Sequence, residues 1–161
     1  MTKLEETVGK LLISKGLKIS TAESCTGGLI SSKLTDVSGS SAYVTLNLTT
    51  YSNDAKIKML NVPAEIIEKY GAVSEECSFS MAKGLYLLTN SDICISTTGI
   101  AGPTGGSPQK PVGLMYSTIY TKKTYNTYKI TLNPNLPRIK MKNEFAETVL
   151  KNVYNFINDN F

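Results

Sequence analysis

The sequence predicts an α/β fold, a single-domain three-layer sandwich in which a mixed, mostly parallel sheet is covered by helices on both faces. Strand-like runs rich in Val, Ile, Thr and Tyr alternate with segments whose apolar residues recur at helical spacing, which is typical of this class. The last two strand-like runs follow each other directly, as in an antiparallel hairpin. The 161 residues, 41% of them hydrophobic, suffice for a sizeable core, and we expect one domain over residues 1–161.

The N-terminal half begins with a predicted helix over residues 3–15. Thr2-x-x-Glu5 is a capping-box pattern at its start, and Gly16 follows the last apolar residue of the helical pattern. A strand over residues 17–22 comes next. The further elements expected in this half are a helix that ends near Thr35, a strand over 42–50, and short helices over 55–60 and 64–70.

The C-terminal half begins with a longer helix that starts after Ser74. Met81, Leu85 and Leu88 are expected to form its buried face. Three strands follow, over 92–98, 112–120 and 125–132. A last helix begins near Arg138, and its expected apolar stripe consists of Phe145, Val149, Leu150, Val153 and Ile157.

The composition excludes several classes of protein. The formal net charge is +4, but the basic residues are scattered and form no block interleaved with aromatic residues, so a dedicated nucleic-acid binder is disfavoured. The N-terminus carries acids where a signal peptide needs an apolar run, and no segment approaches the ~20 apolar residues of a membrane span. We therefore expect a cytoplasmic protein without membrane contact.

The three cysteines, Cys25, Cys77 and Cys94, are too widely spaced to indicate a disulfide framework or a zinc ribbon. Cys77 and Cys94 are expected to be buried.

The chain contains no histidine. This excludes Ser-His-Asp and Cys-His catalysis, histidine zinc sites and histidine acid/base chemistry. Hydrolysis by this chain therefore requires a base of another kind.

Two loops that contain glycines follow predicted strands, one over residues 21–28 and one over 99–108. In α/β sheets ligands bind beyond the carboxyl ends of the strands, so a site shared by the two loops is expected. The first loop carries Ser24 and Cys25 at a strand-to-helix turn, where free backbone N–H groups favour negative charge. From the residues alone a helix cap followed by flexible glycines is an equally good interpretation.

Without histidine, a serine can be activated by a lysine that burial keeps neutral. Lys56 starts a short helix after the strand over 42–50, and that strand could return toward Ser24. The ordinary alternative is a solvent-exposed lysine, and spacing in the sequence does not choose between them.

Five blocks of the chain, taken together and in this order, resemble the CinA C-terminal domain family. They are Thr21-Ala22-Glu23-Ser24-Cys25-Thr26-Gly27-Gly28, Leu34-Thr35-Asp36-Val37-x-Gly39-Ser40-Ser41, Thr50-Tyr51-Ser52-Asn53-x-Ala55-Lys56, Gly71-Ala72-Val73-Ser74, and Gly99-Ile100-Ala101-Gly102-Pro103-x-Gly105-Gly106-x-x-x-Lys110-Pro111-Val112-Gly113. The resemblance implies a nicotinamide-nucleotide amidase, which converts nicotinamide mononucleotide to nicotinic acid mononucleotide and ammonia in pyridine nucleotide salvage. It implies the stand-alone form, with no cofactor and no metal, and members often form homodimers.

The resemblance also implies roles for individual residues. Ser24 would be the nucleophile, and Tyr51 and Lys56 would activate it. We expect the substrate to contact residues of the first and fifth blocks, namely Glu23, Cys25, Thr26, Gly27, Gly99, Ile100, Ala101 and Gly102. Cys25 is the alternative nucleophile, because a thiolate at a helix N-terminus is chemically competent.

The resemblance weakens toward the C-terminus. The family usually has Gly-Asp-Arg before the last helix, whereas this chain has Leu136-Pro137-Arg138 followed by Lys140 and Lys142. Arg138 is aligned with the family arginine and is expected to contact the substrate phosphate. Two other readings stay open: a binding or interaction module that has kept the pocket without its activity, and an amidase for a different small substrate.

Overall fold

A five-stranded mixed sheet forms the centre of the computed structural model, which describes residues 1–161. Its strand order is β2-β1-β3-β4-β5. The first three strands in this order are parallel, and β4 and β5 are antiparallel to their neighbours. The strands are β1 (Ile19–Glu23), β2 (Val44–Thr49), β3 (Ile93–Gly99), β4 (Leu114–Tyr120) and β5 (Tyr125–Thr131).

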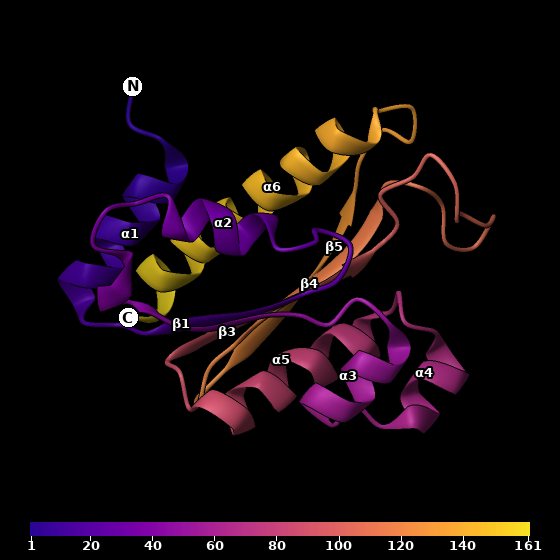
Figure 1. Cartoon of the computed structure of the whole chain (residues 1–161), viewed down its shortest axis with the longest axis horizontal. Helices are drawn as coiled ribbons and strands as arrows, with labels where there is room; N and C mark the ends of the chain where they lie inside the picture. Colours follow the sequence, from indigo (N-terminus) through magenta and orange to yellow (C-terminus); the bar gives the residue numbers. More distant parts are fainter.

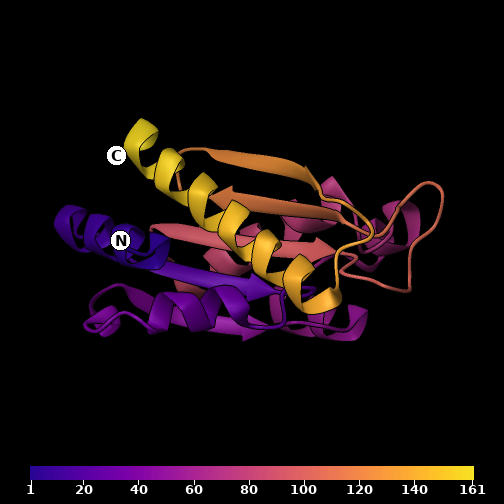
Figure 2. The same cartoon turned by 90° about the horizontal axis from the view of Figure 1, so that it is seen from above.

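Helices cover both faces of this sheet, which confirms the predicted three-layer architecture (Figures 1 and 2). On one face lie α1 (Leu4–Lys15), α2 (Leu29–Thr35) and α6 (Arg138–Asn160). On the other face lie α3 (Asn53–Leu60), α4 (Ala64–Tyr70) and α5 (Glu75–Thr89). A short 3₁₀ helix, Ser40–Ala42, precedes β2.

The register of the parallel strands determines which loops meet. Ala22 of β1 pairs with Leu48 of β2 on one side and with Ser96 of β3 on the other. All three strands therefore end at the same edge of the sheet. The loops that follow β1, β2 and β3 meet there, as predicted for ligand binding in this fold class.

Two apolar clusters hold the layers together. The larger one joins α1, α2 and α6 to the sheet and contains the whole stripe predicted for the last helix. The smaller one packs the helices of the other face onto the sheet through Leu60, Met81 and Leu85. Cys77 and Cys94 are buried in this second cluster, as predicted.

Serine caps mark the starts of two predicted helices; α5 begins after Ser74 as predicted, and α3 begins at Asn53, two residues before the predicted start. The hydroxyl of Ser52 accepts a hydrogen bond from the backbone N–H of Ala55 at the start of α3, and Ser74 accepts one from Cys77 at the start of α5.

Two local predictions are wrong. The helix α1 is capped by Lys3 without a side-chain hydrogen bond, so Thr2 and Glu5 form no capping box. Leu88 is 54% exposed. The buried stripe of α5 follows residues 77, 78, 81, 82 and 85 and continues toward residue 89, which turns Leu88 to the solvent.

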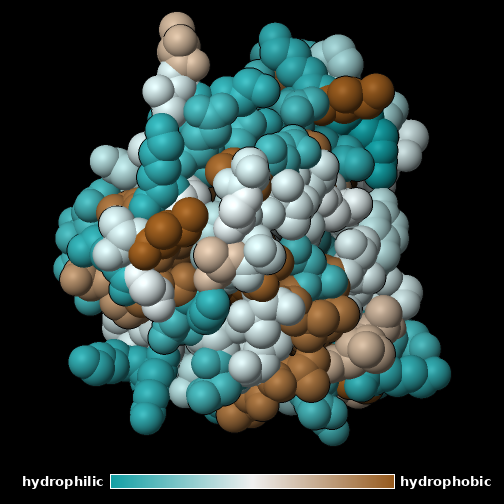
Figure 3. Space-filling view, turned by 60° about the vertical axis from the view of Figure 1, so that its left-hand side comes forward, coloured by the Kyte–Doolittle hydropathy of each residue, from teal (hydrophilic) through white to brown (hydrophobic).

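The surface has mixed polarity, with apolar patches set among hydrophilic residues on the face in Figure 3. Leu87 and Leu88 of α5 and Met59 of α3 are among the exposed large apolar side chains. None of the helices combines the length and the apolar composition needed to cross a bilayer.

We predict that Gly84→Ala destabilises the protein by about 1–3 kcal/mol or more, because a Cβ at this position would stand 1.9 Å from the backbone carbonyl oxygen of Leu60. The end of α3 would have to move away from α5. Denaturant unfolding measures the change, with exposed Lys83→Ala in the same helix as the control. Equal stability of the two variants would contradict this close backbone contact.

Candidate active site

The candidate site is built on the turn between β1 and α2, residues 24–28. The backbone N–H of Ser24 donates to the carbonyl of Thr97 in β3 at 3.1 Å, which ties the start of the turn to the neighbouring strand. Gly27 and Gly28 have φ angles of 64° and 95°, a left-handed conformation that favours glycine. The N–H groups of Cys25 and Thr26 donate to no other group of the protein. The turn therefore carries two free donors next to the Ser24 hydroxyl.

Glu23 holds this turn in place from behind. Its carboxylate is fully buried and accepts four hydrogen bonds, from Thr26 Oγ1, from the N–H groups of Ile30 and Ser31, and from Ser31 Oγ. Thr26 Oγ1 also lies 2.8 Å from Thr97 Oγ1. Glu23 and Thr26, which we expected to contact the substrate, are thus placed behind the turn, where they connect β1, α2 and β3.

Lys56 lies directly beside Ser24 although 32 positions separate them in the sequence. Its Nζ is 3.0 Å from Ser24 Oγ and 3.0 Å from each of the backbone carbonyl oxygens of Thr50 and Tyr51. The parallel pairing of β1 with β2 explains this proximity, because it continues past both strands with a hydrogen bond from Thr50 N–H to the Glu23 carbonyl. The first turn of α3 then directs Lys56 back toward Ser24.

The burial of Lys56 has an electrostatic consequence. The side chain is 1% exposed and forms no ion pair. Burial lowers the pKa of Lys56, although the nearby thiols of Cys77 and Cys25 act in the opposite direction. In the structure Nζ lies within donor distance of all three oxygens. A neutral amine has two N–H bonds and one lone pair, so in that form the two carbonyls would accept its hydrogens and the lone pair would face Ser24 Oγ. This arrangement suits a lysine that takes a proton from a serine.

The pKa of the Cys25 thiol is shifted in the opposite direction. Burial, and secondarily the charge of Glu23, raise the pKa of the Cys25 thiol to about 12. At neutral pH it is therefore a thiol, which is a poor nucleophile. Of the two candidates on this turn, Ser24 has the better-placed base.

The main chain and the side chain of Tyr51 lie in two different environments. Its backbone carbonyl accepts from Lys56 Nζ and, at 3.3 Å, from Ser24 Oγ. Its side chain is 56% exposed, and the hydroxyl accepts a hydrogen bond from Arg138 Nη2 at 3.1 Å. The structure thus brings the main chain of Tyr51, and not its phenol, to Ser24.

A cavity of about 240 Å³ opens in front of the Ser24 turn. Arg138, the first residue of α6, reaches one wall of it and donates from Nη1 to the carbonyl of Gly102 at 2.7 Å. The lining consists of Cys25, Tyr51, Gly99, Ile100, Ala101, Gly102, Thr104, Gly105 and Arg138. Seven of these nine residues were among the predicted site residues. Thr104 and Gly105 were not, although the glycine-rich composition of their loop pointed to them. The other predicted site residues, Ser24, Lys56, Glu23, Thr26 and Gly27, are not part of the lining.

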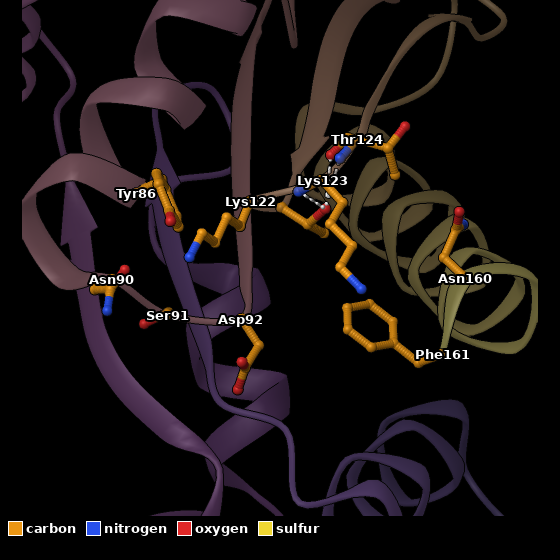
Figure 4. A pocket seen from close by; sticks show the side chains of 10 residues that line it. Tyr86, Asn90, Ser91, Asp92, Lys122, Lys123, Thr124, Asn160 and Phe161 are labelled. Carbon is orange, nitrogen blue, oxygen red and sulfur yellow. Dashed lines mark hydrogen bonds between the residues drawn. The ribbon is translucent and has the colours of Figure 1, made fainter.

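A larger cavity, of about 390 Å³, lies at the other end of the sheet, where β1 and β3 begin (Figure 4). Lys122 and Lys123 from the turn after β4 border it, together with Asp92 and the end of α6. None of the predicted catalytic residues is near it. Nowhere in the structure do three or more Cys, Asp or Glu side chains converge as metal ligands would.

Comparisons with known proteins agree on one family. A family model described as the CinA C-terminal domain matches residues 1–157. A CinA-like protein of Dictyoglomus thermophilum is 50% identical over 140 residues, which cover 87% of this chain and 34% of that protein. A CinA-like protein of Chlorobium limicola is 44% identical over 98% of this chain and 38% of its own length. The chain thus spans about a third of the length of these curated relatives.

Solved structures show the same fold. The competence/damage inducible protein CihA from Agrobacterium tumefaciens is 35% identical, with a TM-score of 0.90 over 98% of each chain. A CinA superfamily protein from Klebsiella pneumoniae is 28% identical, with a TM-score of 0.92 over 97% of this chain and 96% of that one.

We predict that Glu23→Gln lowers the free energy of unfolding by about 2–4 kcal/mol, since an amide NH₂ group would face N–H and O–H donors in a buried place. Urea denaturation measures this, with exposed Glu68→Gln as the matched control. Wild-type stability of Glu23→Gln would show that the carboxylate does not hold the turn.

Proposed function

Because the chain belongs to the CinA C-terminal domain family, we propose that it is a serine amidohydrolase that converts nicotinamide mononucleotide to nicotinic acid mononucleotide and ammonia. The observation that carries this proposal is the 3.0 Å contact between the buried amine of Lys56 and the hydroxyl of Ser24. A buried lysine without an ion pair costs stability, and base catalysis at the adjacent serine gives that arrangement a use.

The first half of the reaction forms an acyl-enzyme. Neutral Lys56 takes the proton of Ser24 Oγ while the oxygen attacks the carboxamide carbon of the substrate. The free N–H groups of Cys25 and Thr26 are suited to stabilise the negative charge that develops on the carboxamide oxygen. When the tetrahedral intermediate collapses, the carbon–nitrogen bond breaks, and Lys56 returns its proton to the leaving nitrogen, which departs as ammonia.

The second half reverses these roles with water. Lys56 takes a proton from a water molecule, the resulting hydroxide attacks the acyl carbon, and the bond to Ser24 Oγ breaks. Ser24 recovers its proton from Lys56, and nicotinic acid mononucleotide leaves. The Gly99–Gly102 loop lines the cavity that would hold the pyridine ring, and Arg138 at the cavity wall is our candidate contact for the phosphate.

Tyr51 supports this chemistry in a different way from the one first expected. Its carbonyl, together with that of Thr50, orients the amine of Lys56. Its phenol holds the guanidinium of Arg138. We propose that Tyr51 positions the base through its main chain and helps to shape the substrate cavity through its side chain.

We predict that Ser24→Ala and Lys56→Ala each lower the rate of ammonia release from nicotinamide mononucleotide by about 10³-fold or more, since each removes one member of the pair. Cys25→Ala is the control and is expected to stay active, because its thiol is protonated at neutral pH. Ammonia is measured directly with the purified proteins. No release by the wild type would exclude the proposed reaction and favour a binding module or another amide substrate. Unchanged release by Ser24→Ala would exclude this nucleophile.

We predict that kcat/KM rises with pH and levels off near the pKa of Lys56, which burial lowers from its ordinary value. Below that pKa the ammonium form cannot accept the serine proton, so kcat/KM falls by about tenfold per pH unit. Measurements between about pH 5 and 10 test this, and Cys25→Ala should give the same profile. Activity that rises as the pH falls would contradict a lysine base.

A further inference from the structure

Two basic side chains of α6 lie at the candidate site, Arg138 at the cavity wall and Lys142 beside the Ser24 turn. Arg138 and Lys142 are four residues apart and therefore lie on the same side of the helix. Two nitrogens of Arg138 already have partners, the Gly102 carbonyl and the Tyr51 hydroxyl. Part of the hydrogen-bonding capacity of Arg138 is thus already used by other groups at the wall of the cavity.

Lys142 has no such partner. Its Nζ forms no hydrogen bond and no ion pair. The Lys142 side chain nevertheless lies close to the turn. A Cβ placed on Gly27 would stand 3.1 Å from Nζ and 3.7 Å from Cε. The carboxylate of Glu23 is not a counterion for it, since that group is fully buried and accepts four hydrogen bonds.

The charge of Lys142 also acts on the turn electrostatically. It lowers the pKa of the Cys25 thiol, against the larger raising effects of burial and Glu23. Cys25 both follows the candidate nucleophile and lines the cavity. An unpaired, half-buried cation therefore lies beside Gly27 of the turn, next to the residues that line the cavity but not among them.

We infer that Lys142 is a specificity-determining residue that binds the phosphate monoester of the substrate from the Gly27 side of the turn. The inference rests on the proposed function, and it adds a second cation to Arg138. Two positive charges one helical turn apart match the double negative charge of a phosphate monoester, and a lysine that carries three donors can reach its oxygens. A substrate without this group loses the contact.

The test compares two substrates and three variants of the same helix. We expect Lys142→Ala to raise KM for nicotinamide mononucleotide by about 10- to 100-fold and to leave kcat within about threefold. KM for nicotinamide riboside, which lacks the phosphate, should not change. Lys142→Arg should restore most of the loss. Lys140→Ala is the matched control, because Lys140 is an exposed lysine two residues away and should affect neither substrate.

Two results would overturn the inference. An unchanged KM for the mononucleotide would show that Lys142 does not contact the phosphate. An equal loss with both substrates, expressed in kcat, would assign the residue to the reacting carboxamide instead. Thermal melting of Lys142→Ala identifies any general effect on folding.

Binding separates this inference from the proposed reaction. Nicotinamide mononucleotide is titrated calorimetrically into Ser24→Ala and into Ser24→Ala/Lys142→Ala, where no turnover is expected. Weaker binding to the double variant supports the inference even if the wild type releases no ammonia. Equal affinity, or no binding to either protein, overturns it, and activity of the wild type would then leave the proposed reaction intact.

Discussion

The candidate site depends on one hydrogen-bonded junction, where the pairing of β1 with β2 continues from Thr50 N–H to the Glu23 carbonyl. This junction fixes the main chain of residues 50 and 51 beside Ser24. Their carbonyls then accept from Lys56 Nζ and make it possible to bury a lysine without an ion pair. The burial that lowers the pKa of this lysine thus follows from sheet pairing, because only a parallel neighbour ends at the same edge of the sheet as β1.

The remaining parts of the site come from the same geometry. The loop after β3 supplies most of the cavity lining, and β3 also anchors the backbone of Ser24 through Thr97. The start of α6 closes the other side with Arg138. Glu23 connects the end of β1 to the first residues of α2, so the turn that carries Ser24 is fixed at both ends. Four segments that are distant in the sequence thereby form one small cavity.

The sequence pattern was sufficient to predict the helices, the strands and their arrangement in layers. Apolar periodicity, serine N-caps and glycines at helix C-termini are local signals that can be read from the sequence. The alternation of strands and helices also indicated that the two glycine loops meet. Side-chain direction was not predictable in this way. Glu23 belongs to the right motif but points behind the turn, the phenol of Tyr51 points away from Ser24, and Leu88 continues an apolar spacing yet faces solvent. Each of these depends on neighbours from other segments. Only the resemblance to a family paired Lys56 with Ser24.

The divided role of Tyr51 has a consequence for how such a site can change. The contacts that orient Lys56 come from main-chain carbonyls, which every amino acid at positions 50 and 51 would supply. The side chain of residue 51 instead borders the mouth of the cavity. Substitutions there can alter which molecules enter while the contact between Lys56 and Ser24 is retained. Descendants of such a chain could therefore diverge in the molecules they admit through few genetic steps, with the proposed proton-transfer pair conserved.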